Sequence, residues 1–125
     1  MPWDLDNDRP IYLQLMEQIQ VEIVAGRYPP GSRLPSVREL AAQAAVNPNT
    51  MQKALAELES SGLVYSQRTS GRMITEDRAM IEELKLRLAR EQAGEFLEKM
   101  ENLGFGREET LGLIRQVIEK EEAKG

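Results

Sequence analysis

The chain has 125 residues, no cysteine, no histidine and a formal net charge of −5 at pH 7, a length that suits one compact domain with a short appendage. The missing residue types exclude disulfides, thiolate nucleophiles, cysteine zinc sites and histidine general bases. The acidic balance taken alone argues weakly against a nucleic-acid partner.

The net charge hides an uneven distribution along the chain. Residues 1–26 and residues 76–125 each carry −4, whereas residues 27–75 hold six basic and three acidic side chains and carry +3. The local field, and not the total charge, attracts a polyanion. The middle of the chain is therefore the part suited to nucleic acid.

No stretch approaches about 18 consecutive apolar residues, the length that spans a bilayer. The N-terminus, Met1-Pro2-Trp3-Asp4, lacks a basic region followed by an apolar run. We therefore expect a cytoplasmic protein without a membrane-spanning segment.

The first predicted element is an amphipathic helix that opens at Asp8-Arg9-Pro10, with Asp8 as a candidate cap, and ends at Gly26. Apolar residues recur every four positions along it. They are Ile11, Leu15, Ile19 and Ile23. A rigid turn is expected at residues 28–32.

Two short helices are expected next. Ser36 and Glu39 have the S-x-x-E spacing of a capping box and begin a helix that ends near Ala45. Asn47-Pro48 suits the cap and first position of another helix, which Gly62 ends. Because only a few residues separate the two helices, they predict a helix-turn-helix.

A β-hairpin and a helical tail complete the predicted chain. Two β-prone runs, residues 63–66 and 73–75, flank a basic, glycine-containing tip and predict a wing. From Asp77 the pattern is helical, with a break at residues 104–106, and a second copy is the simplest cover for its apolar stripe. The predicted dimerisation residues are Ile81, Leu84, Leu88, Phe96, Met100, Leu111, Ile114, Val117 and Ile118. A foreign helix is the less favoured occupant of that stripe.

The predicted fold is mainly helical with a small β-hairpin. A winged helix-turn-helix DNA-binding domain spans residues 1–75, and a two-helix dimerisation tail spans residues 76–125. In such a motif the second helix lies in the major groove with its first turns on base edges.

The residues at these positions suit DNA chemically. Asn and Gln can pair with adenine and Lys with guanine, and arginines contact phosphates or, from a wing, a groove. The candidates are Asn47, Asn49, Thr50, Gln52 and Lys53 on the helix, and Arg33, Arg38, Arg68 and Arg72 around it, together with Ser36 and Ser70. Asn47 is favoured as a helix cap over a base contact, and the alternative for Arg68 and Arg72 is protection of a strand edge.

These motifs resemble the N-terminal winged helix of GntR-family transcriptional regulators. The resemblance covers about residues 8–75 and rests on residues 10–14, 31–41 and 47–64 and on Gly71-Arg72. It implies DNA contacts at Arg38, Pro48, Asn49, Thr50, Gln52 and Gly71. Many family members carry arginine at the positions of Pro48 and Gln52, so the operator sequence stays open. The short tail is similar to that of the YtrA-type subfamily, which implies dimerisation and genes for ATP-driven transporters as neighbours.

Two hypotheses follow. The first is a repressor that acts as a homodimer on a two-fold symmetric, double-stranded operator, with a transporter operon as one target that the resemblance suggests. The alternative is a winged-helix protein-interaction module without DNA binding, which the acidic total favours slightly. No enzymatic activity, cofactor or metal site is expected, since no spacing of carboxylates or lysines suggests one. A small-molecule effector is left open.

Overall fold

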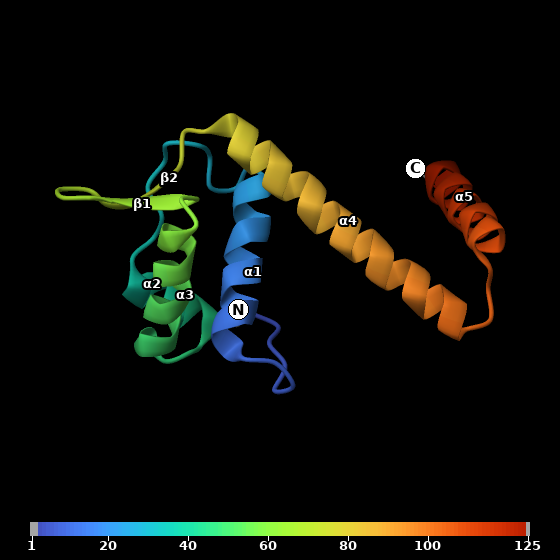
Figure 1. Ribbon diagram of the computed structural model, residues 1–125, viewed down its shortest axis with the longest axis horizontal. Coiled ribbons are helices and arrows are strands. Elements are labelled where there is room, and N and C mark those ends of the chain that lie inside the picture. Colours follow the sequence, from blue (N-terminus) through green and yellow to red (C-terminus); the bar gives the residue numbers. More distant parts are fainter. Residues whose placement is uncertain (1–2, 125) are drawn as a thin grey trace. The chain divides into compact units, whose positions relative to one another are not determined.

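The computed structural model describes residues 3–124, so Met1, Pro2 and Gly125, which belong to the two predicted domains, lie outside the described part. Its elements appear in Figure 1. In chain order they are α1 (Ile11–Val24), α2 (Val37–Ala44), α3 (Pro48–Ser60), β1 (Val64–Gln67), β2 (Gly71–Ile74), α4 (Arg78–Asn102) and α5 (Arg107–Lys124). The prediction of a mainly helical chain with one small hairpin is confirmed.

The chain divides into a first unit that ends at Lys85 and a second unit that begins at Leu86. The division therefore falls inside α4, whereas the predicted boundary after residue 75 lies just before this helix. Among residues 3–124, no helix is both long enough and apolar enough to cross a bilayer.

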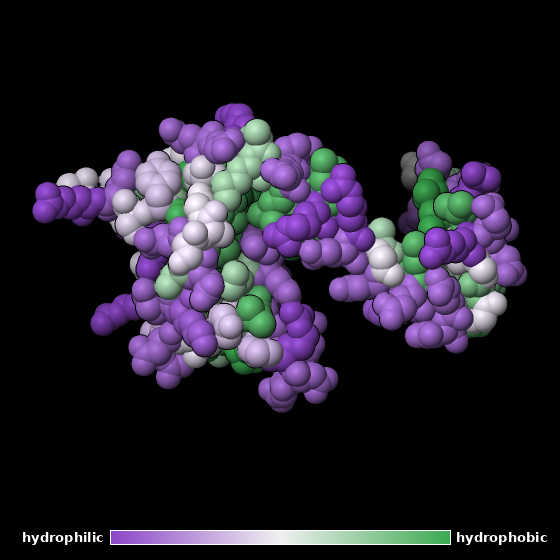
Figure 2. Space-filling model, viewed as in Figure 1, coloured by the Kyte–Doolittle hydropathy of each residue, from purple (hydrophilic) through white to green (hydrophobic). Residues whose placement is uncertain are grey.

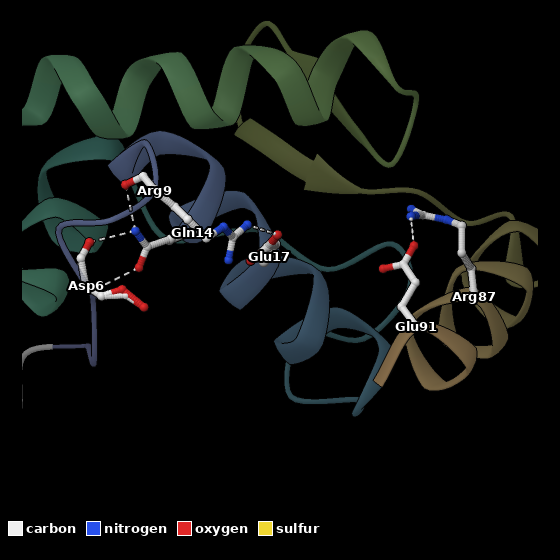
Figure 3. Close-up of polar contacts among 6 residues, drawn as sticks. All are labelled: Asp6, Arg9, Gln14, Glu17, Arg87 and Glu91. Atoms are coloured by element: carbon white, nitrogen blue, oxygen red, sulfur yellow. Dashed lines mark hydrogen bonds and ion pairs between the residues drawn. The ribbon is translucent and has the colours of Figure 1, made fainter. Parts of the chain in front are cut away.

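The start of α1 is held by a buried glutamine. Pro10 is the N-cap and makes no side-chain bond, so the prediction that Asp8 caps the helix is wrong. Instead, Gln14 Oε1 accepts a hydrogen bond from the backbone N–H of Asp6 at 2.9 Å. Gln14 Nε2 donates to the carbonyl oxygens of Asp6 at 2.8 Å and Arg9 at 2.9 Å (Figure 3). These bonds pin the segment before the helix against its first turns.

The turn between α2 and α3 is built by local side chains. The predicted capping box is confirmed: Ser36 Oγ accepts from Glu39 N at 3.2 Å, and Glu39 Oε1 accepts from Ser36 N at 3.3 Å. α2 is followed by its C-cap Ala45, which adopts a left-handed φ of 58° at a cost of about 1 kcal/mol for a residue with a Cβ. Asn47 Oδ1 then caps α3 by accepting from Asn49 N at 2.7 Å.

The core of the first unit is centred on α3, against which α1, α2 and β1 all pack. Its apolar side chains from these four elements are buried. They are Leu15, Ile19, Ile23, Leu40, Ala41, Ala44, Met51, Ala54, Leu55, Leu58 and Val64. Because three elements contact α3, its opposite, polar face is fixed in one orientation.

The wing is an antiparallel hairpin with a third segment along its edge. β1 pairs with β2 in the register Val64↔Ile74 and Ser66↔Arg72. Residues 31–34 run antiparallel to β2, with Gly31 N donating to the Ile74 carbonyl at 3.0 Å and Leu34 N donating to the Arg72 carbonyl at 2.9 Å. Gly31 and Ser32, at the end of the predicted turn, therefore begin a segment that ties α2 to β2.

Candidate nucleic-acid interface

The exposed end of α3 carries the residues predicted to face base edges. Asn47, Pro48, Asn49, Gln52 and Lys53 are exposed, and Thr50 is half-buried. On the opposite side of the same turns, Met51, Ala54 and Leu55 are fully buried. The helix therefore presents one polar face to solvent at its N-terminal end, which is also the end at which a helix dipole favours an anion.

Three cations of the first unit have side chains without an internal partner. Arg33, Arg38 and Arg68 are exposed, and none of their side chains forms a hydrogen bond or ion pair with another residue between residues 3 and 124. An unpaired, solvated guanidinium keeps its full charge and its donors for an external anion. These arginines supply the positive field that the charge distribution predicted for the middle of the chain.

A groove lies between the start of α2 and the wing. It is open to solvent, has a volume of about 480 Å³, and is lined on one side by Arg33, Ser36 and Arg38 and on the other by Gly71 and Arg72. Five of the residues predicted from the sequence to contact DNA therefore meet in one place. Ser66 and Gln67 also line it; sequence reasoning left both out because neither is charged nor part of a motif.

Gly71 marks the bend at the end of the wing tip. Its φ is +87°, a conformation that a residue with a Cβ rarely adopts. A Cβ there would lie 3.8 Å from Arg33 Nε, which is ordinary van der Waals contact. Conformation, and not space, therefore makes glycine the fitting residue at this point.

Arg72 differs from the other arginines of the groove because it has a partner. Arg72 Nε donates to Glu59 Oε1 at 2.8 Å, and Ser66 Oγ donates to the same oxygen at 2.9 Å. The hydrogen bond from Arg72 in the first place, and that from Ser66 in the second, lower the pKa of the Glu59 carboxyl from its ordinary value. Arg72 is thus held against α3.

Lys53 also has an internal contact that the sequence did not indicate. Its Nζ lies 4.0 Å from the centre of the Tyr12 ring, a cation–π contact between α3 and α1. The prediction placed Lys53 on guanine. No local pattern could have paired Lys53 with Tyr12, because the contact depends on how α1 crosses α3.

The predicted dimerisation residues fall into two groups. Ile81 and Leu84 belong to the first unit, where each is 9% exposed and so offers no surface to a second chain. In the second unit Leu88, Met100 and Ile114 are half-buried, whereas Phe96, Leu111, Val117 and Ile118 are exposed. Leu86 and Leu103, which the prediction left out of the dimerisation set, are exposed as well.

The two helices of the second unit leave several of their apolar side chains exposed. α5 makes at most slight contact with α4 within the described residues, and Gly104, with φ of 94°, lies between them. Charged pairs such as Arg87 Nη1 and Glu91 Oε1, 3.0 Å apart (Figure 3), lie on the solvated side of α4. Figure 2 shows apolar surface between the charged side chains of this unit.

The comparisons with known proteins point to one family. Residues 11–74 match the model for "Bacterial regulatory proteins, gntR family". The HTH-type transcriptional regulator YhcF of Bacillus subtilis is 42% identical over 113 residues, which cover 90% of this chain and 93% of that protein. The HTH-type transcriptional repressor YtrA of the same organism is 39% identical over 90 residues, 71% of this chain and 69% of YtrA.

Solved structures agree with this assignment. A GntR family transcriptional regulator from Listeria monocytogenes superposes with a TM-score of 0.80 at 39% identity, covering 90% of this chain and 98% of that one. AraR(DBD) in complex with operator ORX1 superposes with a TM-score of 0.52 at 32% identity, covering 60% and 92%. The capped α3, the groove and the wing, together with these matches, lead to one conclusion: the chain belongs to the GntR family of bacterial transcriptional regulators.

Proposed function

We propose that this regulator is a sequence-specific repressor that binds a two-fold symmetric operator as a homodimer. The observation that carries the proposal is the groove, where exposed Arg33 and Arg38 offer side chains without an internal partner. The polar start of α3 is exposed in the same unit. A duplex whose major groove accepts α3 brings its phosphates toward such cations. The repressor name of YtrA and the operator complex of AraR(DBD) support the same function here.

Roles for the individual residues follow from their position and chemistry. Asn49, Thr50 and Gln52 would meet base edges, since amide side chains pair with adenine and Thr contacts a base or its methyl group. Arg33, Arg38 and Arg68 would contact phosphates, with Ser36 and the backbone around Pro48 close to them. Gly71 and Ser70 would let the wing tip approach the backbone closely. Asn47 is occupied as the cap of α3.

The dimer is supported by the second unit. Phe96, Leu111, Val117 and Ile118 are between 42% and 57% exposed, and α4 and α5 leave them uncovered. Apolar side chains gathered in this way favour association, and a closed two-fold dimer is the commonest solution. Leu88, Met100 and Ile114 would complete the interface. Two recognition helices would then enter major grooves about one helical turn, or a small multiple, apart.

Repression would follow if the bound dimer occludes RNA polymerase, and a transporter operon is the target class that the YtrA-type likeness suggests. The test is gel retardation on the DNA upstream of the chain's own gene. Arg38→Ala should weaken binding to specific and non-specific duplex alike, whereas Gln52→Ala should relax the preference at one base pair. If neither variant changes binding, the assigned face is wrong. A wild type that captures a protein partner but no duplex would instead favour the interaction module.

A further inference from the structure

A single carboxylate joins the recognition helix to both strands of the wing. Glu59 lies near the end of α3, and its Oε1 accepts from Ser66 Oγ on β1 and from Arg72 Nε on β2. Ser66 and Arg72 are direct cross-strand partners. A carboxylate oxygen has two lone pairs and can accept both bonds. The wing is therefore fastened to α3 at one level, just before the tip residues 68–70.

The location of this contact matters because the wing has few other restraints near its tip. The hairpin extends away from the helices of the first unit (Figure 1). Gln67, Arg68 and Thr69 are exposed, whereas the buried anchor residues Val64 and Ile74 lie at the opposite end of the strands. Backbone pairing with residues 31–34 supports β2 as far as Arg72, whereas the Glu59 contact also holds β1 at this level through Ser66. A two-stranded ribbon is marginal without support, so the direction of the tip depends on these contacts nearest to it.

The negative charge of Glu59 indicates that the contact has a role of its own. A carboxylate beside a DNA-binding surface repels phosphate, so it is unfavourable there unless it does something else. Glu59 is neutralised by Arg72, whose side chain is 19% exposed, against 33% for that of Glu59. Charge-assisted bonds of this kind are directional and hold geometry better than a contact between neutral groups.

We propose that Glu59 is a positioning residue for DNA binding: through Ser66 and Arg72 it sets the direction of the wing relative to α3, so that Arg68 reaches the duplex while the start of α3 reads bases. This inference rests on the proposed function. Arg72 then serves chiefly in the contact of Glu59 with Ser66 and Arg72, which we call the brace. The phosphate contact of the wing falls to Arg68.

The test compares Glu59→Gln with Glu57→Gln, using full-length protein and a labelled operator duplex. Glu57 is two residues away on α3, is exposed, and forms no hydrogen bond or ion pair through its side chain within the described chain. Glu57→Gln should bind equally or more tightly, because it removes a negative charge near a polyanion. Glu59→Gln removes the same charge but should bind about fivefold more weakly, as expected for the loss of one partly exposed ion pair.

Epistasis with Arg68 separates positioning from loss of fold. Arg68→Gln should weaken binding on its own, and adding Glu59→Gln to it should cause no further loss, because Glu59 acts through the wing tip. Ser66→Ala removes one of the two bonds and should show a smaller loss in the same direction. Amide exchange of residues 64–74 in free protein should be faster in Glu59→Gln than in Glu57→Gln.

Equal affinity of the two glutamine variants, or losses that add in the Glu59→Gln/Arg68→Gln double variant, would overturn the inference while leaving the proposed function intact. A wild type that binds no duplex would overturn the proposed function itself, and the positioning role with it.

Discussion

Replacing Arg38 by glutamine tests the electrostatic account of the interface. Arg38 is exposed, has no internal partner and lines the groove beside Ser36. Glutamine keeps a polar side chain on a solvated helix face, so α2 and its capping box should remain folded. The substitution therefore removes a charge and leaves the fold intact.

The expected salt dependence of DNA binding follows from the number of unpaired cations at the interface. Each protomer offers Arg33, Arg38 and Arg68, while Lys53 lies over the Tyr12 ring and Arg72 is neutralised by Glu59. A dimer then makes about six phosphate contacts, which predicts a slope of log Kobs against log[salt] of roughly −5. Arg38→Gln removes two contacts per dimer and should reduce the slope to about −3.5.

The assay is fluorescence anisotropy of a labelled operator duplex between about 50 and 200 mM KCl. Over this range wild-type affinity should fall about a thousandfold and that of the variant about a hundredfold. The ratio of wild-type to variant affinity should therefore shrink roughly tenfold as the salt concentration rises. Arg107→Gln, at the start of α5, should keep the wild-type slope. An unchanged slope for Arg38→Gln would refute the assignment of Arg38 to phosphate.

Three further changes probe the cap, the brace and the tail. Ser36→Ala removes the cap bond to Glu39 N and should lower the free energy of unfolding in urea by about 1 kcal/mol; no change would mean that the capping box does not stabilise α2. The pKa of Glu59 is lowered below its ordinary value of 4.5, so its stabilisation should be complete above that value and disappear as pH falls through the lowered pKa. The difference in unfolding free energy between wild type and Glu59→Gln should follow this course, and a difference that persists in acid would contradict it. Val117→Glu places a charge on the exposed apolar face and should give monomers in sedimentation equilibrium, whereas Lys120→Glu on the same helix should not; dimeric Val117→Glu would move the interface elsewhere.

The features that sequence could predict are those encoded by neighbouring residues. Ser36 and Glu39 cap α2 because their spacing matches one helical turn, and Asn47-Pro48 starts α3 for the same local reason. The buried face of α3 follows from its period, and Gly71 adopts the positive φ that a turn requires. The fold class depends on such signals.

The features that sequence missed depend on residues far apart in the chain. Residues 31–34 pair with β2, although the sequence predicted only a turn at residues 28–32, because the pairing is set by a strand that lies far along the chain. The contact of Lys53 with Tyr12 and the bond of Arg72 to Glu59 require knowledge of how helices cross. Helical periodicity likewise assigned Ile81 to a tail stripe, since it cannot tell which unit buries a given turn.

We propose that two copies of this chain read DNA through α3 and the wing. Selection of bound sequences from a pool of random duplexes tests it most directly, because one experiment reports sequence, half-site spacing and symmetry. We predict enrichment of two inverted half-sites about one helical turn, or a small multiple, apart, and loss of preference at one position of each half-site with Gln52→Ala. A pool that stays unenriched, or that yields a single site without two-fold symmetry, would contradict the account.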